Sequence, residues 1–206
     1  MLDFLLTSDP GAPLRLAFEV LGGLHDVADR HPRIIKGISR KSCIFSARAS
    51  ARFLQQVGFA ARTSCCVLFV IEFDASRKPI GTEKIGEFTN SGHLRHDGGW
   101  EGHMVVMVDG FLFDPTAGQI KTERVPSMIA TPERHTMLKG QSTLSAVAVT
   151  RNQRHLQLYW LEAPGSSLRE EIGVAQQAIE DVAHTLAAIY NSRNSNAVVP
   201  RSTSNC

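Results

Sequence analysis

The strongest constraint on the fold is an Asp109-Gly110 pair that separates two short apolar runs, GHMVVMV and FLFDPTAG. Asp-Gly between apolar runs is a strong signal for a two-residue hairpin turn, because both central residues of the favoured turn adopt positive φ. The stretch therefore predicts two antiparallel strands, at 103–108 and 111–115.

A symmetric turn at this pair also predicts the register of the hairpin. Val108 then lies opposite Phe111 and Val105 opposite Asp114, and facing residues point to the same side of the sheet. His103 and Asp114 become diagonal neighbours on one face, with Cβ atoms roughly 7 Å or less apart. We therefore expect the carboxylate to reach the imidazole, where it would select the ring tautomer and stabilise the cation.

The other elements follow from apolar periodicity and from turn residues. Residues 74–99 are rich in Gly, Pro, Asn, Asp and Ser, which indicates a loop with an edge hairpin, and residues 191–206 lack a core pattern. We predict a helix at 13–30 that Gly22 and Gly23 weaken or kink in the middle, and further helices at 43–57 and 167–190. We also predict strands at 65–73, 145–150 and 155–161. The domain interpretation is a single α+β domain over 1–190, followed by a flexible C-terminal tail over 191–206.

Cys43 stands where polar residues give way to the helix of 43–57. The thiolate is the reactive form of cysteine, and both a helix N-terminus and a nearby imidazolium favour it. If this helix packs on the hairpin face that carries His103, then Cys43, His103 and Asp114 converge. They would supply the nucleophile, general base and orienting carboxylate of covalent acyl chemistry, with backbone amides of the helix start holding an oxyanion.

Composition limits the alternatives. The chain has 206 residues, a net charge of +2 and 43% hydrophobic residues, which is ordinary for a soluble domain and gives no case for nucleic acid binding. No apolar run approaches the roughly 20 residues of a membrane span, and the N-terminus has no basic leader, so we expect neither membrane binding nor a signal peptide. Oligomeric state is left open by the sequence.

The cysteine pattern bears on the cellular compartment. The chain has four cysteines, Cys43, Cys65, Cys66 and Cys206, which form no disulfide framework and fit a reducing compartment. The expected location is the cytoplasm, with export as a bacterial effector that lacks a cleaved signal as the alternative.

Two stretches resemble the transglutaminase-like superfamily. CIFSARASARFLQQVGFAAR resembles the segment in which a catalytic cysteine opens a helix that ends near a GxxAR turn, and GHMVVMVDGFLFDPTAG resembles the histidine strand and the following strand that ends in DPT. The family often has an aromatic residue beside the cysteine and His-Ala-Trp at the histidine, where this chain has SCIF and GHMV.

The resemblance implies a papain-like core in which the catalytic helix packs on an antiparallel sheet, covered by the helices at 13–30 and 167–190. It assigns Cys43 as nucleophile, His103 as base and Asp114 as third member of the triad, with no cofactor. We expect hydrolysis of a peptide, protein or small amide substrate. The alternative is acyl transfer to an amine, as in a transglutaminase. Trp100, three residues before His103, is a candidate wall of the substrate site.

The same residues also have purely structural interpretations. Taken singly, Cys43 is a packed thiol, His103 a satisfied core histidine and Asp114 a turn residue; their ordered combination favours catalysis. A catalytically inactive binding module of the same fold, with the 74–99 loop as its contact surface, is a second hypothesis. A metal site of Cys65 or Cys66 with the histidines at 93, 96 and 103 lacks zinc-knuckle spacing, and we predict no metal.

Overall fold

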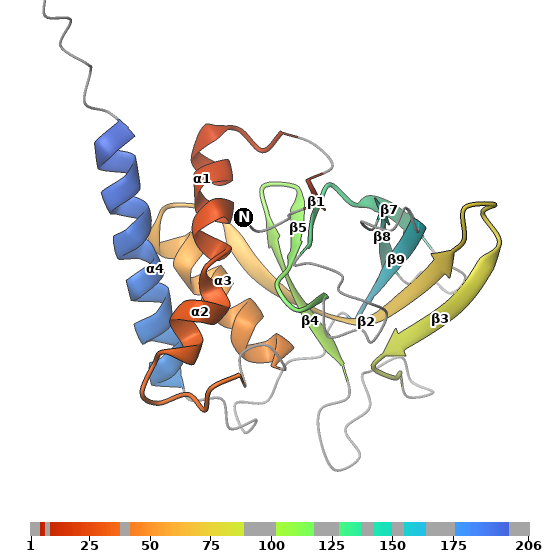
Figure 1. The fold of residues 1–206 in the computed structure, drawn as a ribbon, viewed down its shortest axis with the longest axis horizontal. Coiled ribbons are helices and arrows are strands. Elements are labelled where there is room, and N and C mark those ends of the chain that lie inside the picture. The colour runs from red at the N-terminus through yellow and green to blue at the C-terminus, as the bar shows by residue number, and fades with distance from the viewer. Residues whose placement is uncertain are drawn as a thin grey trace, which may run out of the picture.

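The computed structural model of the protein describes residues 5–6, 9–37, 42–88, 102–117, 128–136, 142–149, 155–163 and 176–197. The helices are α1 (Ala12–Leu21), α2 (Leu24–Asp29), α3 (Cys43–Gln56) and α4 (Gln176–Ala197). The strands are β1 (Leu5–Leu6), β2 (Ala61–Phe73), β3 (Pro79–Ile85), β4 (His103–Val108), β5 (Phe111–Asp114), β6 (Met128–Ala130), β7 (Glu133–Thr136), β8 (Ser142–Val149) and β9 (His155–Glu162). The predicted α+β class is confirmed: the helices gather on one side of a curled sheet (Figure 1).

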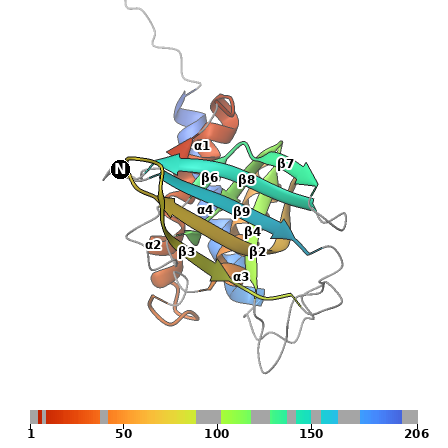
Figure 2. The same cartoon turned by 90° about the vertical axis from the view of Figure 1, so that its right-hand side faces the viewer.

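The long strand β2 organises the sheet. The first half of one edge pairs with β4 and the second half of the same edge pairs with β3, while β9 pairs with the opposite edge from Cys66 onward. The strand order is β1-β6-β5-β4-β2-β9-β8-β7, and apart from the parallel pair β1–β6 the pairs given for the described strands are antiparallel. In Figure 2, β8, β9, β2 and β3 lie in front of the helices.

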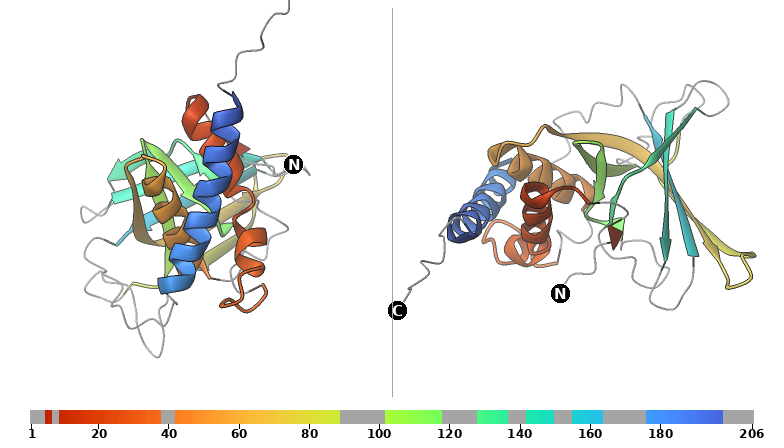
Figure 3. Two further views of the ribbon diagram at one scale, coloured as in Figure 1. Left: turned by 90° about the vertical axis from the view of Figure 1, so that its left-hand side faces the viewer. Right: turned by 90° about the horizontal axis from the view of Figure 1, so that it is seen from above.

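The alternation of side chains along β4 divides the protein into two cores. Met104, Val106 and Val108 face the helices, whereas Val105 faces the inside of the curled sheet. The inner core is centred on the fully buried Trp160 of β9, together with leucines of β2, β5, β8 and β9. Figure 3 shows the sheet curling away from the helical layer, so that each face of β4 is covered by a different part of the chain.

α3 is the helix that lies on the sheet, where it contacts β4 and β2. Its fully buried Ser46, Ala47, Ala49 and Ser50 are small, which allows a close approach between helix and strands. α4 packs on α3, α1 and α2, and therefore forms an outer layer rather than the direct cover of the sheet that the sequence predicted (Figure 3). α1 reaches the sheet through Phe18, whose ring contacts Phe111 and Phe113 of β5.

The predicted hairpin is confirmed in both turn and register. Asp109 and Gly110 have φ of 48° and 83°, as the Asp-Gly signal requires, and Val108 pairs with Phe111. The strand pair near 145–161 is also confirmed as β8 and β9, and β3 is the edge hairpin expected within 74–99.

Several predicted boundaries were wrong. The helix predicted over 13–30 is broken at Gly22 and Gly23 into α1 and α2, and β2 begins at Ala61 rather than at 65 because pairing with β4 extends the strand through polar residues. The predicted end of the last helix at 190, and with it the tail expected from 191, was wrong: α4 continues to Ala197. The first residues of that predicted helix, 167–175, lie outside the described part of the chain.

The short strands β1, β6 and β7 were not predicted, because each is too short to show a period. Among the described residues, no helix combines the length and apolar character needed to cross a membrane.

Candidate active site

Cys43 is the first residue of α3. Ser42 caps the helix, and its Oγ accepts a hydrogen bond from the Phe45 amide at 3.2 Å. The amides of Cys43 and Ile44 make no hydrogen bond with a described residue, as expected for the first turn of a helix, in which amides have no partner four residues earlier. The Cys43 side chain is 8% exposed, and its sulfur lies 3.9 Å from the carbonyl oxygen of Gly102, the residue before β4.

His103 and Asp114 meet as the hairpin register predicted. The Nε2 of His103 lies 2.7 Å from Oδ2 of Asp114, and both side chains are fully buried. A carboxylate oxygen accepts hydrogen bonds, so Nε2 carries the proton and donates it. This assignment leaves the lone pair of the neutral ring on Nδ1, which is buried and has no hydrogen bond of good geometry with the described residues.

Two further donors hold the Asp114 carboxylate. The Trp160 indole donates from Nε1 to Oδ2 at 3.2 Å, and the Thr116 amide donates to Oδ1 at 3.1 Å. Three hydrogen bonds to one buried carboxylate keep it in a single orientation.

The position of Cys43 beside the imidazole is reflected in the acid–base balance of the ring. Burial by itself lowers the pKa of His103, but the charge of Asp114 and its hydrogen bond, together with the nearby Cys43 thiol, overcome this and raise the pKa from 6.5 to about 10. The ring therefore favours the imidazolium form at neutral pH. The expected packing of this helix on the hairpin face that carries His103 was wrong: α3 covers the opposite face of β4, with Met104 and Val106, whereas Asp114 lies with Trp160 on the inner face. Cys43 comes near the His103 ring at the start of β4 instead, where its sulfur lies beside the Gly102 carbonyl.

The other described cysteines are in different environments. Cys66 is fully buried beside β4 and donates to the His103 carbonyl at 3.5 Å, and burial, with the negative groups around it, raises the pKa of its thiol well above the usual value. Cys65 points toward α3 and is partly exposed. Burial first, and then the nearby Cys43, raise the pKa of the Cys65 thiol to about 11, while Arg48 acts in the opposite direction. Both pKa shifts make these two thiols poor nucleophiles at neutral pH.

Three sequence-predicted features lie outside what the structure describes. Trp100, the candidate wall of the substrate site, and the histidines at 93 and 96 of the alternative metal site fall in the segment 89–101. Cys206 lies beyond the last described residue. Within the described ranges, no group of three or more His, Cys, Asp or Glu side chains is arranged to hold a metal ion.

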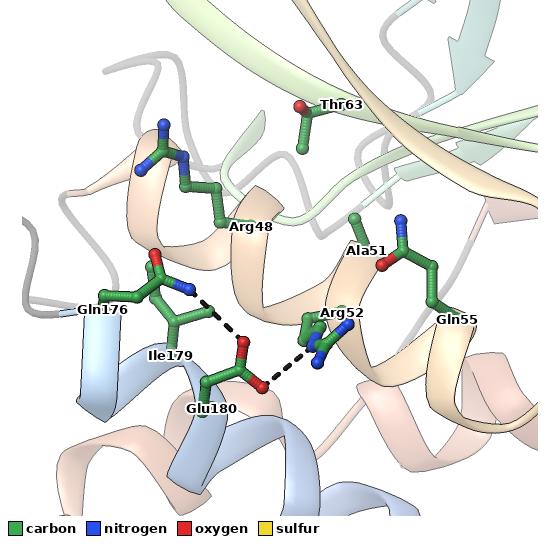
Figure 4. A pocket seen from close by; sticks show the side chains of 8 residues that line it. All are labelled: Arg48, Ala51, Arg52, Gln55, Thr63, Gln176, Ile179 and Glu180. Carbon is green, nitrogen blue, oxygen red and sulfur yellow. Dashed lines mark hydrogen bonds and ion pairs between the residues drawn. The ribbon is translucent and has the colours of Figure 1, made fainter. Parts of the chain in front are cut away.

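A shallow pocket of about 230 Å³ lies between α3, the start of β2 and the start of α4 (Figure 4). Arg48 and Arg52 of α3 face Thr63 of β2 and Glu180 of α4 across it. Glu180 accepts a hydrogen bond from Arg52 Nε at 2.8 Å, whereas Arg48 makes no hydrogen bond or ion pair with the described residues.

Sequence reasoning missed two residues that support the triad. Trp160 comes from β9, and only the curl of the sheet brings it to Asp114. His25 of α2 donates from Nε2 to the carbonyl oxygen of Pro115 at 2.9 Å, next to the carboxylate. Neither residue stands in a motif with a triad member, so no local signal points to them.

Comparison of the chain with family models, with curated proteins and with solved structures finds no match in any of the three.

Proposed function

We propose that this protein is a cysteine-dependent acyl enzyme that hydrolyses a peptide or amide bond through a thioester on Cys43. The observation that carries the proposal is the buried contact of 2.7 Å between His103 Nε2 and Asp114 Oδ2, with Nδ1 left without a described hydrogen-bond partner and the Cys43 thiol near the ring. A histidine that only fills space in a core normally has hydrogen-bond partners for both ring nitrogens. His103 has a carboxylate on one nitrogen and no described partner on the other.

In the proposed reaction the imidazole and the thiol share one proton. Nδ1 takes the proton of the Cys43 thiol, which leaves a thiolate beside an imidazolium that Asp114 stabilises. The helix start adds its partial positive charge to the same end of α3, and that charge also favours the thiolate.

The bonds change in two stages. The thiolate attacks the carbonyl carbon, a C–S bond forms, and the C–N bond breaks after the imidazolium passes its proton to the leaving nitrogen. Water, deprotonated by Nδ1, then attacks the thioester, and the C–S bond breaks to release the acid and the Cys43 thiol. If an amine replaces water, the same intermediate gives acyl transfer.

The amides of Cys43 and Ile44 are candidates for the oxyanion site. They are the first two amides of α3, and the Ser42 hydroxyl occupies the Phe45 amide but leaves these two without a described partner. Backbone donors of this kind stabilise the negative oxygen of a tetrahedral intermediate. The order of the three triad residues, and their placement on a helix start and two adjacent strands, also support a papain-like fold of the transglutaminase-like type.

The test is formation of an acyl-enzyme from an activated ester such as p-nitrophenyl acetate. We expect a burst of p-nitrophenol equivalent to the protein concentration and a mass increase of one acetyl group on the Cys43 peptide. Cys43→Ser and His103→Ala should abolish the burst, whereas Cys65→Ser, the same replacement at a neighbouring thiol, should retain it. Adding a primary amine in the deacylation step then separates hydrolysis from transfer.

An acyl group found equally on Cys65, or a burst that survives His103→Ala, would contradict the proposal. The absence of any acylation in a folded protein would favour the inactive binding module instead.

A further inference from the structure

We infer that the pocket between α3, β2 and α4 binds a carboxylate group of the acyl substrate through Arg48; this inference rests on the proposed function. The pocket combines a cation that has no partner among the described residues with a small apolar area from Ala51 and Ile179. Such a lining fits a short aliphatic stem that ends in a carboxylate, as in an acidic side chain or a small dicarboxylic acid amide.

The charge balance of the pocket singles out Arg48. Arg52 lies one turn further along α3, and Glu180 neutralises it with a contact of 2.8 Å. Glu180 also accepts a hydrogen bond from Gln176 Nε2 at 3.3 Å, so both of its oxygens are engaged. Figure 4 shows Arg48 at the other end of the pocket from Gln55, with no interaction drawn to Glu180. A guanidinium without a carboxylate partner is suited to bind one from solution in a bidentate manner.

The pocket is on the same helix as the proposed nucleophile. Arg48 follows Cys43 by five residues, which is a rise of about 7.5 Å and a rotation of about 140° along a helix, and helical side chains lean toward the N-terminus, which here is the Cys43 end. Thr63 lines the pocket two residues before Cys65 on the same face of β2. Cys43 and Arg48 both affect the pKa of the Cys65 thiol, which Cys43 raises and Arg48 lowers.

This arrangement suggests how the site selects its substrate. With the acyl carbonyl at Cys43, a carboxylate a few bonds away reaches Arg48, and the Thr63 hydroxyl adds a second donor. The neutral Arg52–Glu180 pair closes the far side of the pocket. The substrate class is then an amide or peptide with a negative charge near the bond that is cleaved.

The experiment compares alkylation of Cys43 by two matched pairs of reagents. The first pair is iodoacetate and iodoacetamide, which represent a small acid and its neutral analogue. The second pair is peptidyl chloromethyl ketones with Glu or Gln next to the reactive group, which represent an acidic side chain. For each pair we compare the ratio of the charged to the neutral reagent's rate at Cys43 with the same ratio for a small free thiol. We expect the ratio at Cys43 to be roughly three- to tenfold higher for at least one pair, and this advantage to fall in high salt. The pair with the larger advantage identifies the source of the carboxylate.

Three variants of the pocket give the controls. Arg48→Gln should remove the advantage of the charged reagent over the neutral one, and Arg48→Lys should retain only part of it, because an ammonium cannot bind a carboxylate in a bidentate manner. The matched control is the double variant Arg52→Gln/Glu180→Gln, which removes the neutral pair without changing the net charge of the pocket. A preference that is unchanged in Arg48→Gln, or one that the double variant reduces equally, overturns the carboxylate site alone. If no reagent labels Cys43, the proposed function fails and this inference fails with it.

Discussion

The Asp114→Asn substitution provides the sharpest test of how the site works, because it removes one charge and hardly changes the shape. The carboxylate accepts from His103 and Trp160 on one oxygen and from the Thr116 amide on the other. An asparagine must turn its NH₂ group toward one of these sets of donors. In either orientation the negative charge that holds the imidazolium is lost.

The size of the effect follows from the pKa of His103. The pKa is raised from 6.5 to about 10, although burial alone would lower it. At about 1.4 kcal/mol for each unit, loss of the carboxylate charge removes up to about 5 kcal/mol of imidazolium stabilisation. The proposed thiolate depends on this imidazolium, and a positioned acid–base group contributes roughly 100-fold or more to a rate. We therefore expect alkylation of Cys43 at pH 6 to be roughly 100-fold slower in Asp114→Asn than in the wild-type protein.

The assay is the rate of iodoacetamide labelling between pH 5 and pH 9, followed by intact mass and located by peptide mapping. Asp109→Asn is the matched control, because it makes the same chemical change at the exposed turn of the same hairpin. Circular dichroism establishes that both variants are folded. Labelling of Cys43 in Asp114→Asn at the wild-type rate at pH 6 would refute the proposed role of the ion pair.

Two further predictions concern stability. Trp160→Phe deletes the indole N–H that donates to Asp114 at 3.2 Å and leaves a small cavity in the inner core. The free energy of unfolding, measured in urea, should therefore fall by roughly 2–4 kcal/mol. A change below about 0.5 kcal/mol would contradict this prediction. Because the folded pKa of His103 is raised, its contribution to stability is complete below about pH 6.5 and is lost as the pH rises through about 10. The difference in unfolding free energy between the wild-type protein and His103→Gln should therefore shrink across that window, and a pH-independent difference would be inconsistent with a buried ion pair.

The sequence predicted best those features that depend on neighbours along the chain. The Asp109-Gly110 turn determines which residues of β4 and β5 face each other, and that register brings His103 next to Asp114. The start of α3 was likewise predictable, since the transition from polar to amphipathic residues is a local signal. By contrast, the true end of α4 depends on packing that no local pattern reveals.

By itself, then, the sequence determined three features: the β4–β5 hairpin, the start of a helix at Cys43, and the placement of His103 and Asp114 on the same face of the hairpin. Short-range backbone geometry decides all three. Only the tertiary structure decided that α3 lies on β4 with Cys43 beside the ring. The same is true of Trp160 and Arg48: the curl of the sheet brings the first to Asp114, and the packing of α4 on α3 pairs Arg52 and leaves Arg48 without a described partner. These contacts join segments that are far apart along the chain, and they form only when the two cores exclude water from opposite faces of the same strands.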